Sequence, residues 1–323
     1  MSDPDAPPRV FRMTGSRRGG RVTRRLAVPD VTHRLASLER QVEEALAGAG
    51  RSARLVPPLE TLVDGLLDAY GRVCRAVSGE REAAAELIAA PIDLLSRWWW
   101  RVDVIGIERL PARGPVLVAA NRAGALLPYE AFVLARSLGR APEGSERATR
   151  VAHPVVDAWL LELPLAGTIA STLGAVPATA DALRRALAGG DIAITFPEGP
   201  DSLAKPVGRR YRLAPFGRAA LLRVAVESAA PIVPVAVIGA EEAQPVFWRS
   251  ERLGRLLGLP ALPVPPAIVP LPTKWTIHVG EPLDPPARGS RDRRLIRGLS
   301  ARLRERLQGL VSDAVNRRRG LFV

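Results

Sequence analysis

The sequence is poor in residues that would indicate an oxidising compartment, a membrane span or a metal centre. It has one cysteine, Cys74, so no disulfide can form within the chain, and this favours a cytoplasmic protein. The closest candidate for a membrane-spanning helix, 256–273, is uncharged but contains six prolines, which such a helix does not tolerate. The three histidines lie far apart and no Cys/His cluster has metal-ligand spacing, so we expect no metal site.

Lysine is nearly absent as well. Lys205 and Lys274 are the two lysines among 46 basic residues, and all the others are arginines. With 33 acidic residues the formal net charge is +13, which favours an anionic partner such as a nucleic acid, an acidic membrane surface or a phosphorylated substrate. Aromatic residues make up 5% of the chain and are not interleaved with the basic runs, so binding to single-stranded nucleic acid is disfavoured.

Composition divides the chain into three segments. Residues 1–30 are rich in arginine, glycine and proline, and we expect them to be a disordered basic tail. Residues 31–100 carry apolar side chains at helical spacing, which predicts a helical N-terminal region. This region ends in three tryptophans, 98–100, which either anchor the protein at a membrane interface or pack against the domain that follows.

From 101 to 323 the pattern alternates between strands and helices, which is typical of an α/β domain with a largely parallel sheet flanked by helices. Pro234 indicates that one strand lies near a sheet edge or a bulge. The pattern predicts strands at 102–105, 116–120, 173–176, 192–196, 232–238 and 275–279, and helices after 130, at 181–188 and at 216–226.

Two more helices are expected. Residues 151–163 have a mixed helical pattern, which would put His153 and Asp157 on one helix face. Residues 291–319 form an amphipathic pattern that is rich in arginine. This last helix either docks on the domain through its leucines or binds an anionic membrane surface. Its expected apolar stripe consists of Leu295, Leu299, Leu303, Leu307 and Leu310.

One stretch, VLVAANRAGALLPYE at 116–130, begins as a buried strand, breaks at a turn of small residues and resumes as a helix. Such a junction is where α/β proteins place their sites. ITFPEG follows at 194–199 and VPVAVIG at 233–239. In this order, and together with LGAVPATADALRRAL and PLPTKWTIHVGEPLDPP, these motifs resemble the glycerolipid acyltransferase superfamily, the PlsC-like lysophospholipid acyltransferases. The resemblance covers about two thirds of the chain.

The resemblance implies transfer of a fatty acyl group from acyl-CoA or acyl carrier protein to a glycerolipid hydroxyl, without a cofactor. It also implies peripheral attachment to the inner face of the cell membrane. It places Arg122 at the position of the catalytic base and Glu130 at that of its acidic partner. It assigns acceptor binding to Asn121, Phe196, Pro197, Glu198 and Gly199, while Pro234 and Gly239 match the last motif. The following loop, with Arg209 and Arg210, either binds phosphate or is simply solvated.

Arg122 departs from the family pattern, which has histidine here. A guanidinium group has a pKa above about 12 and cannot accept a proton at neutral pH. Loss of the base removes a rate factor of about 10²–10⁴. We expect Arg122 and Glu130 to form an ion pair. Either His153 or a desolvated Glu130 replaces the base, or the chain is a catalytically impaired relative that binds lipid or regulates another protein.

Overall fold

The computed structural model describes residues 10–12, 81–123, 127–141, 148–162, 166–202, 205–217, 219–251, 262–264, 270–285, 293–318 and 320. The chain forms two compact units, one of Met1–Thr14 with Ala85–Val323 and the other of Gly15–Ala84. Apart from the first residues of helix α3, the second unit lies outside the described residues, as does most of the predicted helical region 31–100. Everything below concerns the first unit.

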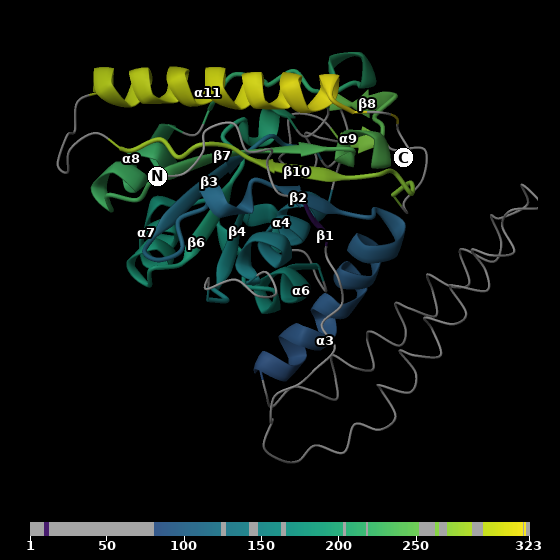
Figure 1. Cartoon of the computed structure of the whole chain (residues 1–323), viewed down its shortest axis with the longest axis horizontal. Helices are drawn as coiled ribbons and strands as arrows, with labels where there is room; N and C mark the ends of the chain where they lie inside the picture. The colour runs from purple at the N-terminus through teal and green to yellow at the C-terminus, as the bar shows by residue number, and fades with distance from the viewer. Residues whose placement is uncertain are drawn as a thin grey trace, which may run out of the picture. The chain divides into compact units, whose positions relative to one another are not determined.

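An eight-stranded sheet forms the centre of this unit, in the order β1-β2-β10-β7-β3-β6-β4-β5. The five strands from β7 to β5 are parallel to one another, while β10 is antiparallel to β7. This arrangement confirms the predicted α/β fold with a largely parallel sheet (Figure 1). The strands are β1 (Val10–Arg12), β2 (Asp103–Ile105), β3 (Val116–Ala120), β4 (Ala152–Val156), β5 (Val176–Pro177), β6 (Ile192–Thr195), β7 (Ile232–Ile238) and β10 (Thr276–Val279), with β8 (Trp248–Ser250) and β9 (Leu262–Val264) as a separate pair.

Both faces of the sheet are covered by helices. Val118 of β3 packs on the side of α4, and its neighbours Leu117 and Ala119 pack on the side of α7, α8 and α11. Burial on both faces explains the unbroken apolar strands of the sequence. The α-helices are α3 (Arg81–Leu94), α4 (Tyr129–Gly139), α5 (Ala158–Glu162), α6 (Ala166–Thr172), α7 (Ala180–Ala188), α8 (Ala219–Glu227), α9 (Ala240–Ala243) and α11 (Arg293–Asn316). A π-helical turn, η2 (Leu95–Trp99), extends α3, and short 3-10 turns are η3 (Ile107–Arg109), η4 (Gly199–Ser202) and η5 (Val207–Arg209).

Several local predictions differ from the structure. Residues 152–156, read as helical, form β4, because a fully buried strand lacks the alternation that separates it from a helix. The strand predicted at 173–176 is reduced to Val176–Pro177 and follows helix α6. Val10–Arg12, inside the segment expected to be disordered, pairs with β2; the rest of 1–30 lies outside the described residues.

Pro234 lies in β7, which is an interior strand and not an edge. The carbonyl of Pro234 accepts a hydrogen bond from the N–H of Gly280, the residue directly after β10. The N–H that proline lacks would therefore point to the place where the hydrogen bonds between β7 and β10 end. The next pairing, between Ile232 and Leu283, is shifted by one residue relative to the β7–β10 register. One extra residue lies on the chain that continues from β10, so the bulge predicted near Pro234 is confirmed.

The tryptophans at 98–100 divide between core and surface. Trp100 is buried and stacks on Trp275, with ring centroids 4.4 Å apart. Trp99 donates from Nε1 to the carbonyl of Pro270 at 2.7 Å. Only Trp98 is exposed, at 41%, with the Arg97 guanidinium over its ring. Two of the three side chains therefore serve packing, the second of the two roles expected for them.

Helix α11 packs on β7 and α8 (Figure 1). Its leucine stripe differs from the prediction, because Leu295 is 46% exposed and Leu310 is half-buried. The apolar face is used within the domain, which confirms the expected docking of this helix. The buried side chains of the helix are Ile296, Leu299, Leu303, Leu307, Val311 and Ala314.

Candidate functional site

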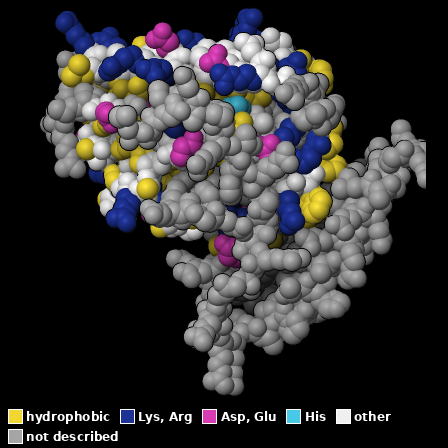
Figure 2. Space-filling model, in the orientation of Figure 1, with side chains coloured by type: hydrophobic (Ala, Val, Ile, Leu, Met, Phe, Trp, Pro, Cys, Tyr) yellow, Lys and Arg dark blue, Asp and Glu magenta, His cyan; other side chains and the backbone are white. Residues whose placement is uncertain are grey.

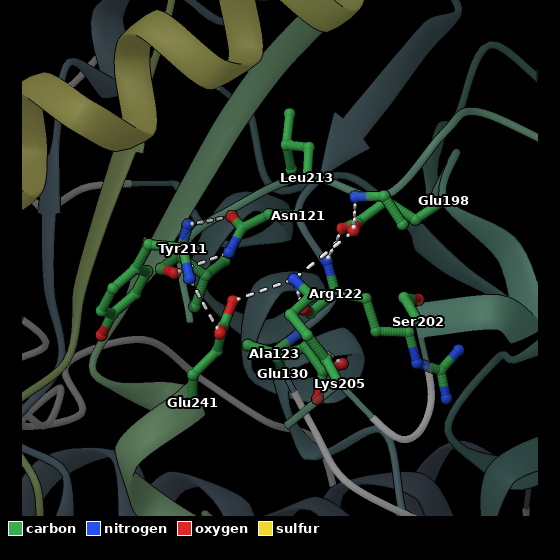
Figure 3. Close-up of polar contacts among 12 residues, drawn as sticks. Asn121, Arg122, Ala123, Glu130, Glu198, Ser202, Lys205, Tyr211, Leu213 and Glu241 are labelled. Carbon is green, nitrogen blue, oxygen red and sulfur yellow. Dashed lines mark hydrogen bonds and ion pairs between the residues drawn. The ribbon is translucent and has the colours of Figure 1, made fainter. Parts of the chain in front are cut away.

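The candidate site lies at the carboxyl edge of the parallel strands. Arg122 follows β3, Asp157 follows β4, Glu198 comes shortly after β6, and Glu241 follows β7. Since these four strands are parallel, their carboxyl ends meet at one edge of the sheet, where α/β proteins bind ligands. Figure 3 shows Arg122, Glu198, Lys205 and Glu241 together there.

Asn121 links two strands of this edge. Its side chain is fully buried, donating from Nδ2 to the carbonyl of Val237 at 3.0 Å and accepting from the Val237 N–H at 2.7 Å. An amide is suited to this position because it carries a donor and an acceptor side by side. Both ends of the Asn121 side chain therefore face the backbone of β7, and the link fixes the turn that presents Arg122.

Glu198 ties the two main motifs together. Its fully buried carboxylate accepts the Arg122 N–H at 2.9 Å and the Ala214 N–H at 2.7 Å. Lys205 Nζ lies 3.4 Å from the same carboxylate. Gly199 directly follows Glu198, and its φ of 71° lies in the left-handed region that favours glycine. Glu198 thus acts as an anchor for residues 76 positions away in sequence.

The Arg122 side chain is 4% exposed, and its main charged contact is with Asp157, at 3.6 Å between Nη1 and Oδ2. The Phe196 ring lies below the guanidinium, with 5.8 Å from Cζ to the ring centroid. Nε of Arg122 is buried and has no hydrogen-bond acceptor within the described part of the chain. Among the described residues, no ion pair joins Arg122 to Glu130, so the predicted partner was wrong and Asp157 takes its place.

Glu130 lies in the first turn of α4 and is fully buried. Its Oε1 accepts the N–H of Ala123 at 3.4 Å, while Oε2 has no hydrogen-bond partner among the described residues. The carboxylate therefore holds the turn next to Arg122 through the backbone. A negative group in the first turn of a helix is favoured by the helix dipole.

Lys205 and Glu241 extend the site toward β7. Lys205 Nζ lies 3.2 Å from Glu241 Oε1 and 3.4 Å from the carbonyl of Arg122. Burial lowers the pKa of Lys205, but the Glu241 and Glu198 carboxylates raise it by more, so the ammonium is charged. Burial raises the pKa of Glu241 to about 7 against the opposing effect of Lys205. Glu241 therefore changes charge near neutral pH.

Tyr211 connects this cluster to the end of α11. Its backbone N–H donates to Glu241 Oε2 at 3.0 Å, and its φ of 60° is left-handed. Its hydroxyl donates to Glu242 Oε2 and accepts the Gly239 N–H at 2.9 Å. Burial and the Glu242 charge raise the pKa of the phenol. Arg318 lies 2.9 Å from Glu242 Oε1, just beyond α11.

Position 239, which donates its N–H to the Tyr211 hydroxyl, has a backbone conformation that requires glycine. Its φ is 100°, and a Cβ added there would lie 2.1 Å from the carbonyl oxygen of Lys274. Any side chain would therefore push β7 away from the residue that precedes Trp275. The glycine that the sequence placed in the last motif has this structural reason.

The remaining predicted residues either lie next to Glu198 in the sequence or are exposed on the neighbouring loop. Phe196, Pro197 and Gly199 are buried, and the Pro197 carbonyl accepts the N–H of Gly217 at 3.1 Å. Arg209 and Arg210 are exposed in and after η5, and Arg210 Nη1 lies 3.9 Å from Glu242. Their side chains extend from the loop that contains Lys205 and Tyr211.

Neither described histidine lies at this edge. His153 is in β4 near its amino end, where its ring contacts the carbonyl of Gly174 at 3.0 Å and Asp191 Oδ2 at 3.2 Å. It shares no helix face with Asp157, which follows the other end of the strand. His278 in β10 lies against Thr276, and burial lowers its pKa to about 4. The expectation that His153 replaces the base is therefore wrong, because His153 lies at the other edge of the sheet from Arg122.

Sequence reasoning missed two site residues. Asp157 was paired with His153 because 151–163 was read as one helix. Glu241 is absent from the predicted site, although its side chain is buried at 7% exposure. The signal that finds both is their position within three residues of the carboxyl end of a parallel strand.

Within the described ranges, no group of three or more His, Cys, Asp or Glu side chains could hold a metal ion. No helix of the described residues is long and apolar enough to cross a membrane.

Comparison with known proteins gives relatives but no family model that matches. The chain is 34% identical over 235 residues to uncharacterized proteins of Mycobacterium leprae and Mycobacterium tuberculosis. The alignments cover 69% of this chain and 63% and 64% of those relatives, so the chain spans less than two thirds of their length. It is also similar, at 19% identity and a TM-score of 0.47, to the crystal structure of the 1-acyl-sn-glycerophosphate acyltransferase PlsC from Thermotoga maritima, covering 77% of this chain and 89% of that one.

Proposed function

We propose that this chain is an acyltransferase-family protein of glycerolipid metabolism. Its substrates would be an acyl thioester, carried by CoA or acyl carrier protein, and the hydroxyl of a lysoglycerophospholipid. The observation that supports the proposal is Glu198: the FPEG motif and the Asn121–Arg122 turn resemble those of acyltransferases, and this carboxylate binds the N–H of Arg122 at 2.9 Å. Two motifs distant in sequence thus form one built site at the edge where ligands bind.

Arg122 favours a second candidate, in which the same scaffold binds its ligands but transfers acyl groups poorly. Acyl transfer needs a base that takes the hydroxyl proton as the oxygen attacks the thioester carbonyl. The guanidinium is permanently charged, and neither described histidine is near. Such a protein would act as a lipid-binding or regulatory subunit. The shared chemistry of the two candidates is recognition of an anionic, acylated glycerol compound.

Basic side chains supply that recognition in both candidates. Lys205 is charged and held beside the Arg122 backbone, while Arg209 and Arg210 extend from the same loop into solvent. Guanidinium groups bind phosphate oxygens in a bidentate manner. We propose that this loop takes the phosphate of the acceptor and that the protein works at the inner face of the cell membrane, attached peripherally.

The decisive experiment measures acyl transfer by the full chain from acyl-CoA, and separately from acyl carrier protein, to 1-acylglycerol 3-phosphate. Wild type, Arg122→His and Arg122→Ala are compared, with the diacyl product detected by mass spectrometry. Detection of released thiol is less suitable because Cys74 is itself a thiol. Binding of acyl-CoA and of the lysolipid by titration calorimetry is measured on the same samples.

The outcomes separate the candidates. Robust transfer by wild type, lost in Arg122→His, establishes the enzyme and contradicts the impaired version. Ligand binding by all three proteins with transfer in Arg122→His alone establishes a scaffold whose base was lost. No transfer and no ligand binding by any of them contradicts both candidates.

A further inference from the structure

The outward side of α11 is strongly basic. Six arginines of the helix are exposed against two exposed acidic residues, Glu305 and Asp313. Figure 2 shows lysine and arginine side chains gathered along the top of the view, where Figure 1 places α11. We call this set the arginine face of α11: Arg293, Arg294, Arg297, Arg302, Arg304 and Arg306.

The apolar side of the helix is already occupied. The six buried side chains of the helix, of which Ile296 is the first and Ala314 the last, lie on the side that packs on β7 and α8. An amphipathic helix normally binds a membrane by inserting its apolar face, and here that face is unavailable to lipid. Leu295 is the large exposed apolar side chain of the helix. Any attraction of the outward side to a partner is therefore electrostatic.

The shape of this outward side suits a flat partner. At 100° per residue, the line opposite the buried face passes close to the small residues Gly298, Ala301, Gly309 and Ser312, but it also passes through Glu305 and close to Arg294. Arg297 and Arg304 lie on one flank of that line, and Arg302 and Arg306 lie on the other. A helix of 24 residues is about 36 Å long. The four small residues on this line leave room for the helix to approach a plane, with Glu305 as the one acid that faces it, while long arginines on either flank reach the plane.

We propose that the arginine face of α11 docks on the phosphate plane of an anionic lipid bilayer. The proposal rests on the peripheral membrane attachment proposed above and names the surface that provides it. A bilayer fits better than a DNA groove because the arginines are spread along a helix about 36 Å long, whereas a helix-turn-helix recognition helix contacts the bases through its N-terminal residues.

The same helix holds the loop of the candidate site. Gln308 accepts the N–H of Leu213 at 2.8 Å and donates to the carbonyl of Tyr211 at 2.9 Å. Arg304 donates to the carbonyl of Leu213 at 3.1 Å. The next residue, Ala214, donates to Glu198. Docking of α11 thus brings the lipid surface to the helix that positions the site loop.

The test is sedimentation of the full chain with sucrose-loaded vesicles, either of phosphatidylcholine alone or of phosphatidylcholine with phosphatidylglycerol. The triple variant Arg297→Gln, Arg302→Gln, Arg306→Gln is compared with wild type. The matched control neutralises three exposed arginines outside α11, namely Arg113, Arg185 and Arg223. Thermal melting of each variant verifies that it is folded.

Each arginine near an anionic surface contributes about fivefold in partitioning, from about 1 kcal/mol per charge. We expect the α11 variant to bind anionic vesicles about a hundredfold more weakly and the control to lose much less, because it removes charge outside the docking face. Wild-type binding should also fall steeply with salt, since the Debye length is about 8 Å at 0.15 M.

Three results would overturn the inference in different ways. Equal losses in the two triple variants would show that net charge alone matters and that α11 is not the docking surface. Unchanged binding by the α11 variant would assign attachment to another segment and leave peripheral attachment intact. Tight binding to a duplex oligonucleotide with no vesicle binding would contradict the lipid surface altogether. None of these bears on the acyl-transfer assay, which uses soluble substrates.

Discussion

Each end of strand β4 has a pair of ionisable side chains, and the two pairs differ in composition and burial. Near the amino end, His153 lies 3.2 Å from Asp191 Oδ2, a histidine beside a carboxylate. After the carboxyl end, Asp157 lies 3.6 Å from the Arg122 guanidinium. His153 and Asp157 are four residues apart on an extended chain, a distance of about 13 Å.

The comparison teaches that residue type does not define the site. The His153–Asp191 pair has the composition of a base with its orienting carboxylate, yet it lies where β4 and β6 begin. The Arg122–Asp157 pair cannot move a proton at neutral pH, yet it lies among the strand ends that α/β folds use for ligands. Place in the sheet decides which pair meets a substrate.

Moving a histidine to the carboxyl edge has the largest expected effect. The second candidate, the scaffold that transfers acyl groups poorly, predicts that Arg122→His raises acyl transfer by about 10²–10⁴-fold over wild type, since it restores a titrating group beside buried carboxylates. His153→Gln, at the amino edge, should leave the rate of Arg122→His unchanged. Both are measured as diacyl product formed per minute. A loss of rate in the double variant would place His153 in the mechanism and break the comparison.

The contributions of the Arg122–Asp157 and His153–Asp191 pairs to the free energy of unfolding can be compared by neutralising the acid of each pair. Asp157→Asn should cost about 3–5 kcal/mol in the free energy of unfolding, because it leaves the buried Arg122 charge uncompensated. Asp191→Asn should cost about 0–1 kcal/mol, since His153 and Asp191 are 20% and 28% exposed and solvent screens them. Urea denaturation at pH 7 measures both. Equal costs would show that the edges do not differ in burial.

The pH dependence of stability at the carboxyl edge should follow Glu241. Its pKa is raised from 4.5 to about 7, mainly by burial. Between these pH values the folded protein keeps a proton that the unfolded chain has released, so this group's contribution to stability falls as pH rises through the window.

Glu241→Gln removes that titration. The stability of wild type relative to this variant should therefore fall from pH 4.5 to 7 and level off above it. Denaturation at several pH values measures the difference, with Glu305→Gln on the exposed side of α11 as the control. A difference that is independent of pH would mean that Glu241 ionises as it does in the unfolded chain.

The smallest expected effect tests the link between α11 and the site loop. Gln308→Ala removes two hydrogen bonds to the loop backbone, each contributing about 0.5–1.5 kcal/mol. We expect a loss of about 1–2 kcal/mol in unfolding free energy and faster amide exchange at Leu213 and Ala214. Glu305→Gln, on the exposed side of α11, is the control. Unchanged amide exchange at Ala214 would contradict the claim that α11 positions the site loop.

Much of the fold could be predicted because most of the sheet is buried on both faces. The apolar runs of β3, β6 and β7 and the turn of Gly189 after α7 are visible in sequence. β4 was missed because its buried run, AHPVV, is as compatible with a helix as with a strand. That one error also produced the wrong partner for Asp157.

The sequence by itself determined that a permanently charged Arg122 stands at the end of a buried strand, because a pKa above about 12 follows from the guanidinium group alone. It also determined the order of the motifs and the excess of arginine. The tertiary structure decided which carboxylate faces that charge and which arginines remain exposed. These depend on strand order and on which side of α11 is buried, and both result from packing between segments far apart in the chain.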